Sequence, residues 1–384
     1  MLAAFRLMVS WATLFIIGTD LFVVSPILPL IADDYQVGAQ GAGLIVMTFA
    51  LGYVAAAPIF GHLADRIGRR RVLTTCLTIF AAANFLTAVA HTLPAMMAAR
   101  ILCGIAAAGV TPSIYVLAGT SAPSGRRGTW IAIVLTGLLS SLPLGAPIGA
   151  MVSLALGWPT VFVGLAGCSL VLVPLHRSLW PDVRNTANTH TDPRDNFSAL
   201  ALAGRLAPTV AWSTALYGMY TYLGAGLATL GYGPDAIAAI VGIYGAAAFA
   251  GALLGGRIAD RLGPAVAIRM SLTGLCVCLT ILWFAIQHGV LVEVAFGMTS
   301  LLAQVFFPAQ QSLLLNEFPT RNSTVLAWNN SALFLGMALG SLIGGQAMAI
   351  GGFTAILPIS ATITIAGWAG FNRCRILSAS PGVA

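Results

Sequence analysis

The 384-residue sequence contains no lysine, and charged residues make up only 8% of it. Soluble domains normally carry about 25% charged residues. An ordinary water-soluble protein of this composition is therefore excluded, because too much apolar surface would face water. The formal net charge of +7 comes from arginines. These lie on short turns between apolar runs, which argues against nucleic-acid binding.

The motifs of most enzymes and metal proteins are also missing. The sequence has no HExxH, no nucleophile–base set and no pair of deep carboxylates, so we expect no enzymatic activity, no cofactor and no metal site. No two of the six cysteines form a CxxC pair, and we expect all of them to be small apolar residues in or beside helices. These cysteines are Cys76, Cys103, Cys168, Cys276, Cys278 and Cys374.

What the sequence does contain is long apolar runs. Hydrophobic residues make up 58% of the chain, and the mean hydropathy is +0.92. Runs of about 20 apolar residues predict twelve spans. They lie near residues 8–32, 40–60, 72–92, 94–118, 127–151, 157–176, 207–229, 234–254, 266–287, 289–315, 323–349 and 352–372. The predicted fold is thus an all-α polytopic membrane protein with twelve transmembrane helices.

The positions of the arginines predict the orientation. Apart from Arg100, all arginines lie at the termini or in the linker and turns of one side, whereas the opposite loops hold Asp33, Asp34, Asp235 and His288 and no arginine. By the positive-inside rule, both termini lie in the cytoplasm. Met1–Ile31 carries Asp20 at its middle and should remain as the first span rather than be cleaved as a signal peptide. We expect the protein in the cytoplasmic (inner) membrane.

A charged turn is repeated once in each half of the chain. Gly61–Leu73 reads GHLADRIGRRRVL, and Gly256–Gly263 reads GRIADRLG at an offset of 195 residues. The same offset relates Gly145 and Gly149 to Gly340 and Gly344. We therefore predict an N-terminal six-helix bundle (1–176), a polar cytoplasmic linker (177–206) and a C-terminal six-helix bundle (207–384). Repeats of this kind place the binding site between them near the membrane midplane.

Twelve spans in two repeats with this loop motif resemble the major facilitator superfamily. Gly18-Thr-Asp20 followed by Pro26-Ile-Leu-Pro29 is similar to the first helix of the twelve-span drug:proton antiporters. Arg100-Ile-Leu-Cys-Gly104 resembles their fourth-helix motif, with Cys103 where glutamine is common. Gly145-Ala-Pro147-Ile-Gly149 and Gly157–Phe162 are similar to the arabinose-efflux-like and sugar-efflux branch, except that Pro159 stands where that branch usually has arginine.

This resemblance implies that the loop motif latches the outward-facing state. The latch would comprise Gly61, Asp65, Arg66, Gly68 and Arg69, with the echo Asp260 and Arg261. The alternative is that these residues only determine topology and form ordinary ion pairs. On helix five, Gly145, Pro147 and Gly149 are better explained by close packing and bending than by ligand contacts. The resemblance associates that motif with antiporters.

Asp20 and Arg100 are the charges that lie deep in the spans. Asp20 is about 18 Å from Met8 at 1.5 Å per residue, and a carboxylate at that depth costs about 3 kcal/mol on insertion scales. Asp20 is our candidate proton carrier, with a substrate contact or a structural hydrogen bond as alternatives. Arg100 would tune Asp20 or hold an anionic group, or else bond helix carbonyls. Its partner is Asp20, through a long reach, or Asp33 or Asp34.

Other polar and aromatic residues form a set that lines a cavity or joins helices by hydrogen bonds. They are Tyr53, Tyr115, Tyr217, Tyr220, Gln304, Phe307, Gln311, Asn329 and Asn330. Together these features predict a proton-coupled antiporter that exports a small drug-like or sugar-like molecule by alternating access. The alternative is a proton symporter or facilitator for uptake. The expected partners are a small-molecule substrate, protons and the lipid bilayer, with the protein as a monomer.

Overall fold

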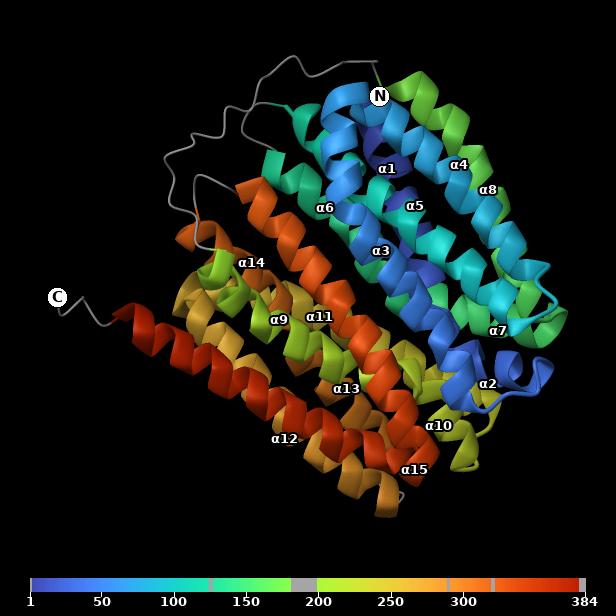
Figure 1. Ribbon diagram of the computed structural model, residues 1–384, viewed down its shortest axis with the longest axis vertical. Helices are drawn as coiled ribbons and strands as arrows, with labels where there is room; N and C mark the ends of the chain where they lie inside the picture. The colour runs from blue at the N-terminus through green and yellow to red at the C-terminus, as the bar shows by residue number, and fades with distance from the viewer. Residues whose placement is uncertain (1, 124–126, 181–198, 289–290, 319–321, 380–384) are drawn as a thin grey trace. The chain divides into compact units, whose positions relative to one another are not determined.

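The computed structural model describes residues 2–123, 127–180, 199–288, 291–318 and 322–379. Within these ranges the chain is helical apart from short turns, and no strand occurs among them, which agrees with the all-α prediction (Figure 1). The helices are α1 (Leu2–Phe22), α2 (Val24–Asp34), α3 (Ala39–Ile67), α4 (Arg69–Ala88), α5 (Leu93–Thr120), α6 (Arg127–Ser140), η1 (Ser141–Gly145), α7 (Ala146–Leu156), α8 (Trp158–Leu179), α9 (Ala199–Thr221), α10 (Leu223–Thr229), α11 (Pro234–Leu262), α12 (Pro264–His288), α13 (Val292–Gln304), α14 (Phe306–Glu317) and α15 (Asn322–Ala379).

Several predicted spans are interrupted or joined. By length and composition, ten stretches of the described chain can cross a membrane. One of these, within α15, contains two predicted spans, since Gly351 and Gly352 break the helical backbone there. The span predicted at 207–229 corresponds to α9 and α10, which meet at Tyr222. The stretch at 207–229 is not among the ten. With it added, and with the two spans of α15 counted separately, the structure is consistent with twelve spans.

The described residues form two compact units. Those within Met1–Asn188 and Leu223–Ala246 make up the first, and those within Thr189–Tyr222 and Ala247–Ala384 make up the second. The chain therefore passes from one unit to the other at Tyr222 and again within α11. The division into bundles 1–176 and 207–384 stays a prediction, and residues 181–198 of the predicted linker lie outside the described residues.

In the first unit, α3 and α5 pack against each other at two glycines. A Cβ atom on Gly104 would overlap the backbone carbonyl oxygen of Phe49, and one on Gly52 would overlap that of Ile101. Small residues at such crossings let helix backbones approach closely inside a membrane. On its other sides α5 contacts α4 and α6, and α4 also packs on α8.

The fifth span of the first unit consists of α6, η1 and α7, and its counterpart in the second unit is the first part of α15. The packing of this span is repeated in the two units. In the first unit Gly145 lies against Thr19 of α1, and Gly149 lies against Val23, the residue directly after α1. In the second unit their counterparts Gly340 and Gly344, both on α15, lie against Thr214 and Gly218 of α9. Helix five also contains the π-helical turn η1, around Pro143. Proline has no N–H to give to a carbonyl one turn earlier, so this span bends at η1.

The charged turns have the same backbone form in both repeats. Gly68 joins α3 to α4 with a φ of 95°, and Gly263 joins α11 to α12 with a φ of 87°. Only glycine adopts such positive φ values without strain. The offset of 195 in the sequence therefore corresponds to a repeated local structure.

We expect Gly104→Ala to destabilise the protein, because the added Cβ cannot fit against the Phe49 carbonyl. Overpacking of this kind costs about 1–3 kcal/mol, so the thermal unfolding temperature in detergent should fall. Gly164→Ala on α8 is the matched control, since a Cβ there meets nothing within 4 Å. Alanine has the higher helix propensity, so the control should be as stable as the parent. Equal stability of the two variants would contradict the tight crossing.

Candidate proton-coupling site

The two deep charges, Asp20 and Arg100, form an ion pair inside the first unit. Asp20 lies in the last turn of α1, and Arg100 lies two turns after the start of α5. Nη1 of Arg100 donates to Oδ1 of Asp20 at 2.6 Å, and Nη2 donates to the Asp20 backbone oxygen at 3.4 Å. The side chains are 0% and 1% exposed. An arginine–carboxylate pair of this length is a strong, charge-assisted contact.

The rival partners for Arg100 are now excluded. Asp33 and Asp34 are exposed at the end of α2, and Asp34 Oδ2 accepts a hydrogen bond from Trp158 Nε1 at 3.1 Å. The long reach of the Arg100 side chain that the sequence analysis considered is the one observed. Arg100 therefore belongs to the Asp20 site.

Three further elements surround the guanidinium. Phe49 of α3 and Phe162 of α8 present ring faces to it, with Cζ at 4.8 Å and 5.6 Å from the two ring centroids. The Cys103 thiol of α5 interacts with Arg100 and with the Thr87 hydroxyl of α4. Thus five helices contribute a side chain to one buried charged site.

The pair leaves one acceptor open. Asp20 Oδ2 is buried and has no hydrogen-bond partner among the described residues, and the same holds for Arg100 Nε. An unsatisfied, ionised carboxylate oxygen in an apolar environment is costly to maintain, and a proton on it removes the negative charge. The ionised pair has no net charge, whereas the protonated pair carries the charge of Arg100. The geometry therefore allows Asp20 to accept a proton at Oδ2 while Oδ1 keeps its contact with Arg100.

The predicted latch residues lie at helix ends. Arg66 is exposed in the last turn of α3, and Asp260 and Arg261 are exposed in the last turns of α11. Gly61 lies within α3, Gly68 forms the turn, and Arg69 begins α4 and is half-buried. The side chain of Asp65 lies outside the described side chains, so its partner stays a prediction.

Arg70, the next residue of this motif, has a contact that the sequence did not predict. Its Nη1 donates to the backbone oxygens of Arg177 at 3.2 Å and of Trp180 at 3.0 Å. Arg6 Nε donates to the backbone oxygen of Leu179 at 2.9 Å. Two cations thus bind the free carbonyls at the C-terminal end of α8, where the helix dipole favours positive charge.

The predicted cavity residues are divided between the two units. Tyr53 is buried and Tyr115 half-buried in the first unit. In the second unit Tyr217, Tyr220, Gln304 and Asn329 are buried, whereas Phe307, Gln311 and Asn330 are half-buried. Asn329 Oδ1 accepts a hydrogen bond from Thr209 at 2.8 Å, which is the helix-joining alternative for this residue.

One polar and aromatic group of the second unit lies at the junction of α13 and α14, where the φ and ψ of Val305 stay helical. Span ten divides into α13 and α14 at Val305, three residues before Pro308. Trp212 Nε1 donates to the Ala303 oxygen at 2.8 Å, and Ser271 Oγ donates to the Leu302 oxygen at 2.6 Å. The Trp212 ring stacks on Phe306 and Phe307 at 5.0 Å and 6.1 Å. Side chains of α9 and α12 thus bind carbonyls of α13, and Trp212 was not predicted from the sequence.

His176 is a buried titratable residue that the sequence pattern did not single out. Its Nδ1 accepts from Trp180 Nε1 at 2.9 Å, and its Nε2 lies 2.8 Å from Thr13 Oγ1. Thr13 Oγ1 donates its own proton to the Val9 oxygen. The hydrogen bond between His176 and Thr13 is therefore donated by Nε2–H and accepted by Oγ1. The neutral ring is therefore satisfied on both sides, and His176 joins α8 to α1.

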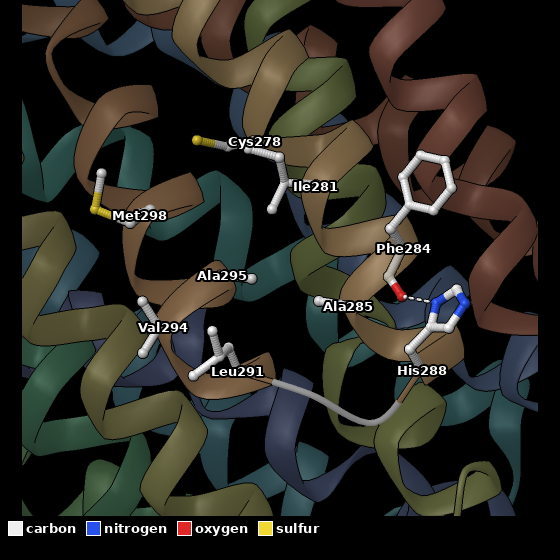
Figure 2. Close-up of a pocket in the computed structure, with 9 residues that line it drawn as sticks. All are labelled: Cys278, Ile281, Phe284, Ala285, His288, Leu291, Val294, Ala295 and Met298. Atoms are coloured by element: carbon white, nitrogen blue, oxygen red, sulfur yellow. Dashed lines mark hydrogen bonds between the residues drawn. The ribbon is translucent and has the colours of Figure 1, made fainter.

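A groove of about 430 Å³ lies between α12 and α13 (Figure 2). Its lining is almost entirely apolar and includes Ile281, Phe284, Leu291, Val294 and Met298, with His288 at one end. None of the predicted cavity residues is part of this lining. These apolar side chains are exposed on membrane-spanning helices, so we do not assign the groove to the transported molecule.

Sequence reasoning also missed the aromatic partners of Arg100. Phe49 lies one turn before the predicted Tyr53 on α3, and Phe162 ends the Gly157–Phe162 motif. A phenylalanine in an apolar helix has no sequence signal that separates a cation contact from ordinary core packing.

Comparisons with known proteins agree with this fold. The model of the Major Facilitator Superfamily matches residues 10–232 and 210–374. The uncharacterized MFS-type transporter YceJ of Bacillus subtilis is 29% identical, over 92% of this chain and 93% of its own. The chloramphenicol resistance protein of Streptomyces lividans is 30% identical over 64% of each chain. The solved structure of a D-xylose-proton symporter superposes with a TM-score of 0.79 at 15% identity, covering 95% of this chain and 97% of its own.

These similarities extend over nearly the whole chain and agree with the helical, apolar, duplicated architecture. They describe transporters and not enzymes. The chain belongs to the Major Facilitator Superfamily, and it is a multi-pass membrane transporter.

Proposed function

We propose that this protein is a proton-coupled antiporter that exports a small drug-like or sugar-like molecule from the cytoplasm. The observation that carries the proposal is the buried Asp20–Arg100 pair, in which Asp20 Oδ2 has no hydrogen-bond partner among the described residues. A buried ionisable group in a membrane span is a functional candidate by default.

The mechanism couples the charge of this site to alternating access. With Asp20 ionised, the pair is neutral. A proton that enters from the outer side binds Oδ2 and neutralises the carboxylate, which leaves Arg100 as a buried positive charge whose hydrogen bond to Oδ1 is kept. Release of the proton to the cytoplasm restores the neutral pair. Because the two forms differ by one buried charge, they favour different arrangements of the bundles. Substrate binding in the opposite arrangement completes an exchange.

Two further observations support the proposed direction of transport and substrate class. The helix-five sequence with Gly145, Pro147 and Gly149 is the pattern that resembles antiporters, and one relative is named a chloramphenicol resistance protein. The D-xylose-proton symporter shares only the fold, but it keeps proton-driven uptake as the second candidate function. Substrate that accumulates on the side toward which protons flow would favour this second candidate.

We further propose that the protein is a monomer in the cytoplasmic (inner) membrane with both termini in the cytoplasm. The arginine distribution supports this orientation. It makes the ends of α3 and α11, which carry Arg66 and Arg261, cytoplasmic.

The first experiment uses purified protein in liposomes, with chloramphenicol and D-xylose as probes and an imposed pH gradient. A thermal-shift screen of sugars, antibiotics and organic cations widens the choice of probe. Antiport predicts that the probe accumulates on the side from which the protons flow. It also predicts that a probe gradient imposed without a pH gradient drives protons in the direction opposite to the probe, which changes the pH of the lumen. Equal transport with and without the gradient would rule out proton coupling.

We expect Asp20→Asn to abolish gradient-driven transport, because asparagine cannot exchange a proton. Exchange of labelled for unlabelled probe without a gradient should persist, since the amide resembles the protonated acid in shape. Asp33→Asn is the matched control, because Asp33 is exposed at the end of α2. Gradient-driven transport that survives in Asp20→Asn would assign the proton to another residue. If Asp20→Asn leaves Arg100 too costly to bury, the double variant Asp20→Asn/Arg100→Gln restores a neutral site for the exchange assay.

For the latch, we expect Asp65→Asn to lower the maximal transport rate about fivefold, which corresponds to about 1 kcal/mol from a lost charge–dipole or ion-pair contact. The affinity for the probe should not change, because the loop is far along the chain from the binding residues. Arg71→Gln tests a neighbouring charge of the motif that the latch does not include. A change in affinity with an unchanged rate in Asp65→Asn would contradict the latch.

A further inference from the structure

We infer that Phe49 and Phe162 form an aromatic clamp on Arg100, which holds its guanidinium in place when Asp20 takes up a proton. This inference rests on the proposed proton coupling at Asp20 and deepens it. It assigns a positioning role to two residues that look like ordinary core.

The clamp is defined by its geometry. Arg100 Cζ lies 4.8 Å from the ring centroid of Phe49 and 5.6 Å from that of Phe162. Both distances are within the range of about 6 Å over which a cation is attracted to a ring face. The two rings come from α3 and α8, and both are fully buried.

Neighbouring residues fix each ring in this position. Gly104 lies one turn after Arg100 on α5, and its missing side chain lets the Phe49 backbone close onto that helix. Phe162 makes an edge contact with Trp158 one turn earlier, at 6.0 Å between centroids. The Trp158 indole in turn donates to Asp34. The rings are therefore held by the helices rather than by Arg100 itself.

The need for the clamp follows from the charges at the site. Among the described residues, the titratable groups that act on Arg100 are Asp20 of α1 and Cys103 of α5. Thr87 of α4 contacts the Cys103 thiol and does not titrate. From α3 and α8, Phe49 and Phe162 contact Arg100, and neither side chain titrates. When Asp20 is protonated, its negative charge is lost. The ring faces then remain as partners that stabilise a positive charge and cannot be neutralised.

The rings also bias the equilibrium between the two forms. The negative face of an aromatic ring stabilises a nearby cation and disfavours a nearby anion. Arg100 is charged in both forms, so its attraction to the rings does not distinguish them. The unfavourable interaction of the ring faces with a carboxylate exists only in the ionised pair and favours the form with protonated Asp20. The clamp should therefore raise the pH at which Asp20 takes up its proton, and its removal should lower that pH.

The test follows the proton itself and requires no identified substrate. In purified protein, infrared difference spectroscopy over pH measures the C=O band of protonated carboxyl groups, and the Asp20 band is the one lost in Asp20→Asn. We expect Phe49→Leu and Phe162→Leu each to lower the midpoint of this band, because each removes a ring face that disfavours the neighbouring carboxylate. Phe49→Tyr, which keeps a ring face, should restore the parent midpoint.

Phe80→Leu is the matched control, because Phe80 is a fully buried phenylalanine of α4 in the same unit. Its midpoint should equal that of the parent protein. Midpoints in Phe49→Leu and Phe162→Leu that equal that of Phe80→Leu would overturn the clamp and leave the proton-coupling proposal intact. If Asp20→Asn removes no titrating band, the proton-coupling proposal fails, and the clamp fails with it. Phe49→Met serves as the second ring-free variant if Phe49→Leu does not yield folded protein.

Discussion

A charge inside a membrane span must have a partner, and this constraint organises the first unit of the protein. An unpaired buried charge costs several kcal/mol, whereas a hydrogen-bonded pair recovers much of that cost. Asp20 and Arg100 meet this requirement at 2.6 Å with almost no exposure. The contact draws α1 and α5 together, and the aromatic rings of α3 and α8 complete the surroundings of the guanidinium. The placement of these four helices can thus be understood from one ion pair.

The same pair introduces asymmetry into a duplicated chain. At the offset of 195 residues, Asp20 and Arg100 correspond to Ala215 and Ala295, so the second repeat carries neither charge. The small-residue packing did survive duplication, since helix five contacts the first helix of its repeat through glycines in both units. The scaffold is therefore repeated, whereas the charged site belongs to one half. The second unit has instead an aromatic stack around Trp212 at the junction of α13 and α14.

Close packing and bending occur in the same helices. Spans one, seven and ten have local irregularities at Val23, Tyr222 and Val305, and span five contains the π-helical turn Ser141–Gly145. Val23 and Val305 keep helical φ and ψ, so the chain is not unwound at these two residues. Inside a bilayer, carbonyls released at such irregularities must find partners within the protein. Ser271 and Trp212 supply these partners at one of them.

The amino-acid sequence by itself determined the class of protein, the helical spans, the duplication and the two deep charges. These properties depend on apolar run length, arginine placement and a repeated motif, all of which are local features of the chain. Only the tertiary structure decided that Arg100 pairs with Asp20 rather than with Asp33 or Asp34, that Phe49 and Phe162 face the guanidinium, and that Arg70 binds the end of α8. Each of these contacts joins residues far apart in sequence. Their formation depends on where helices cross and bend, because a long side chain can reach several partners and the packing selects one.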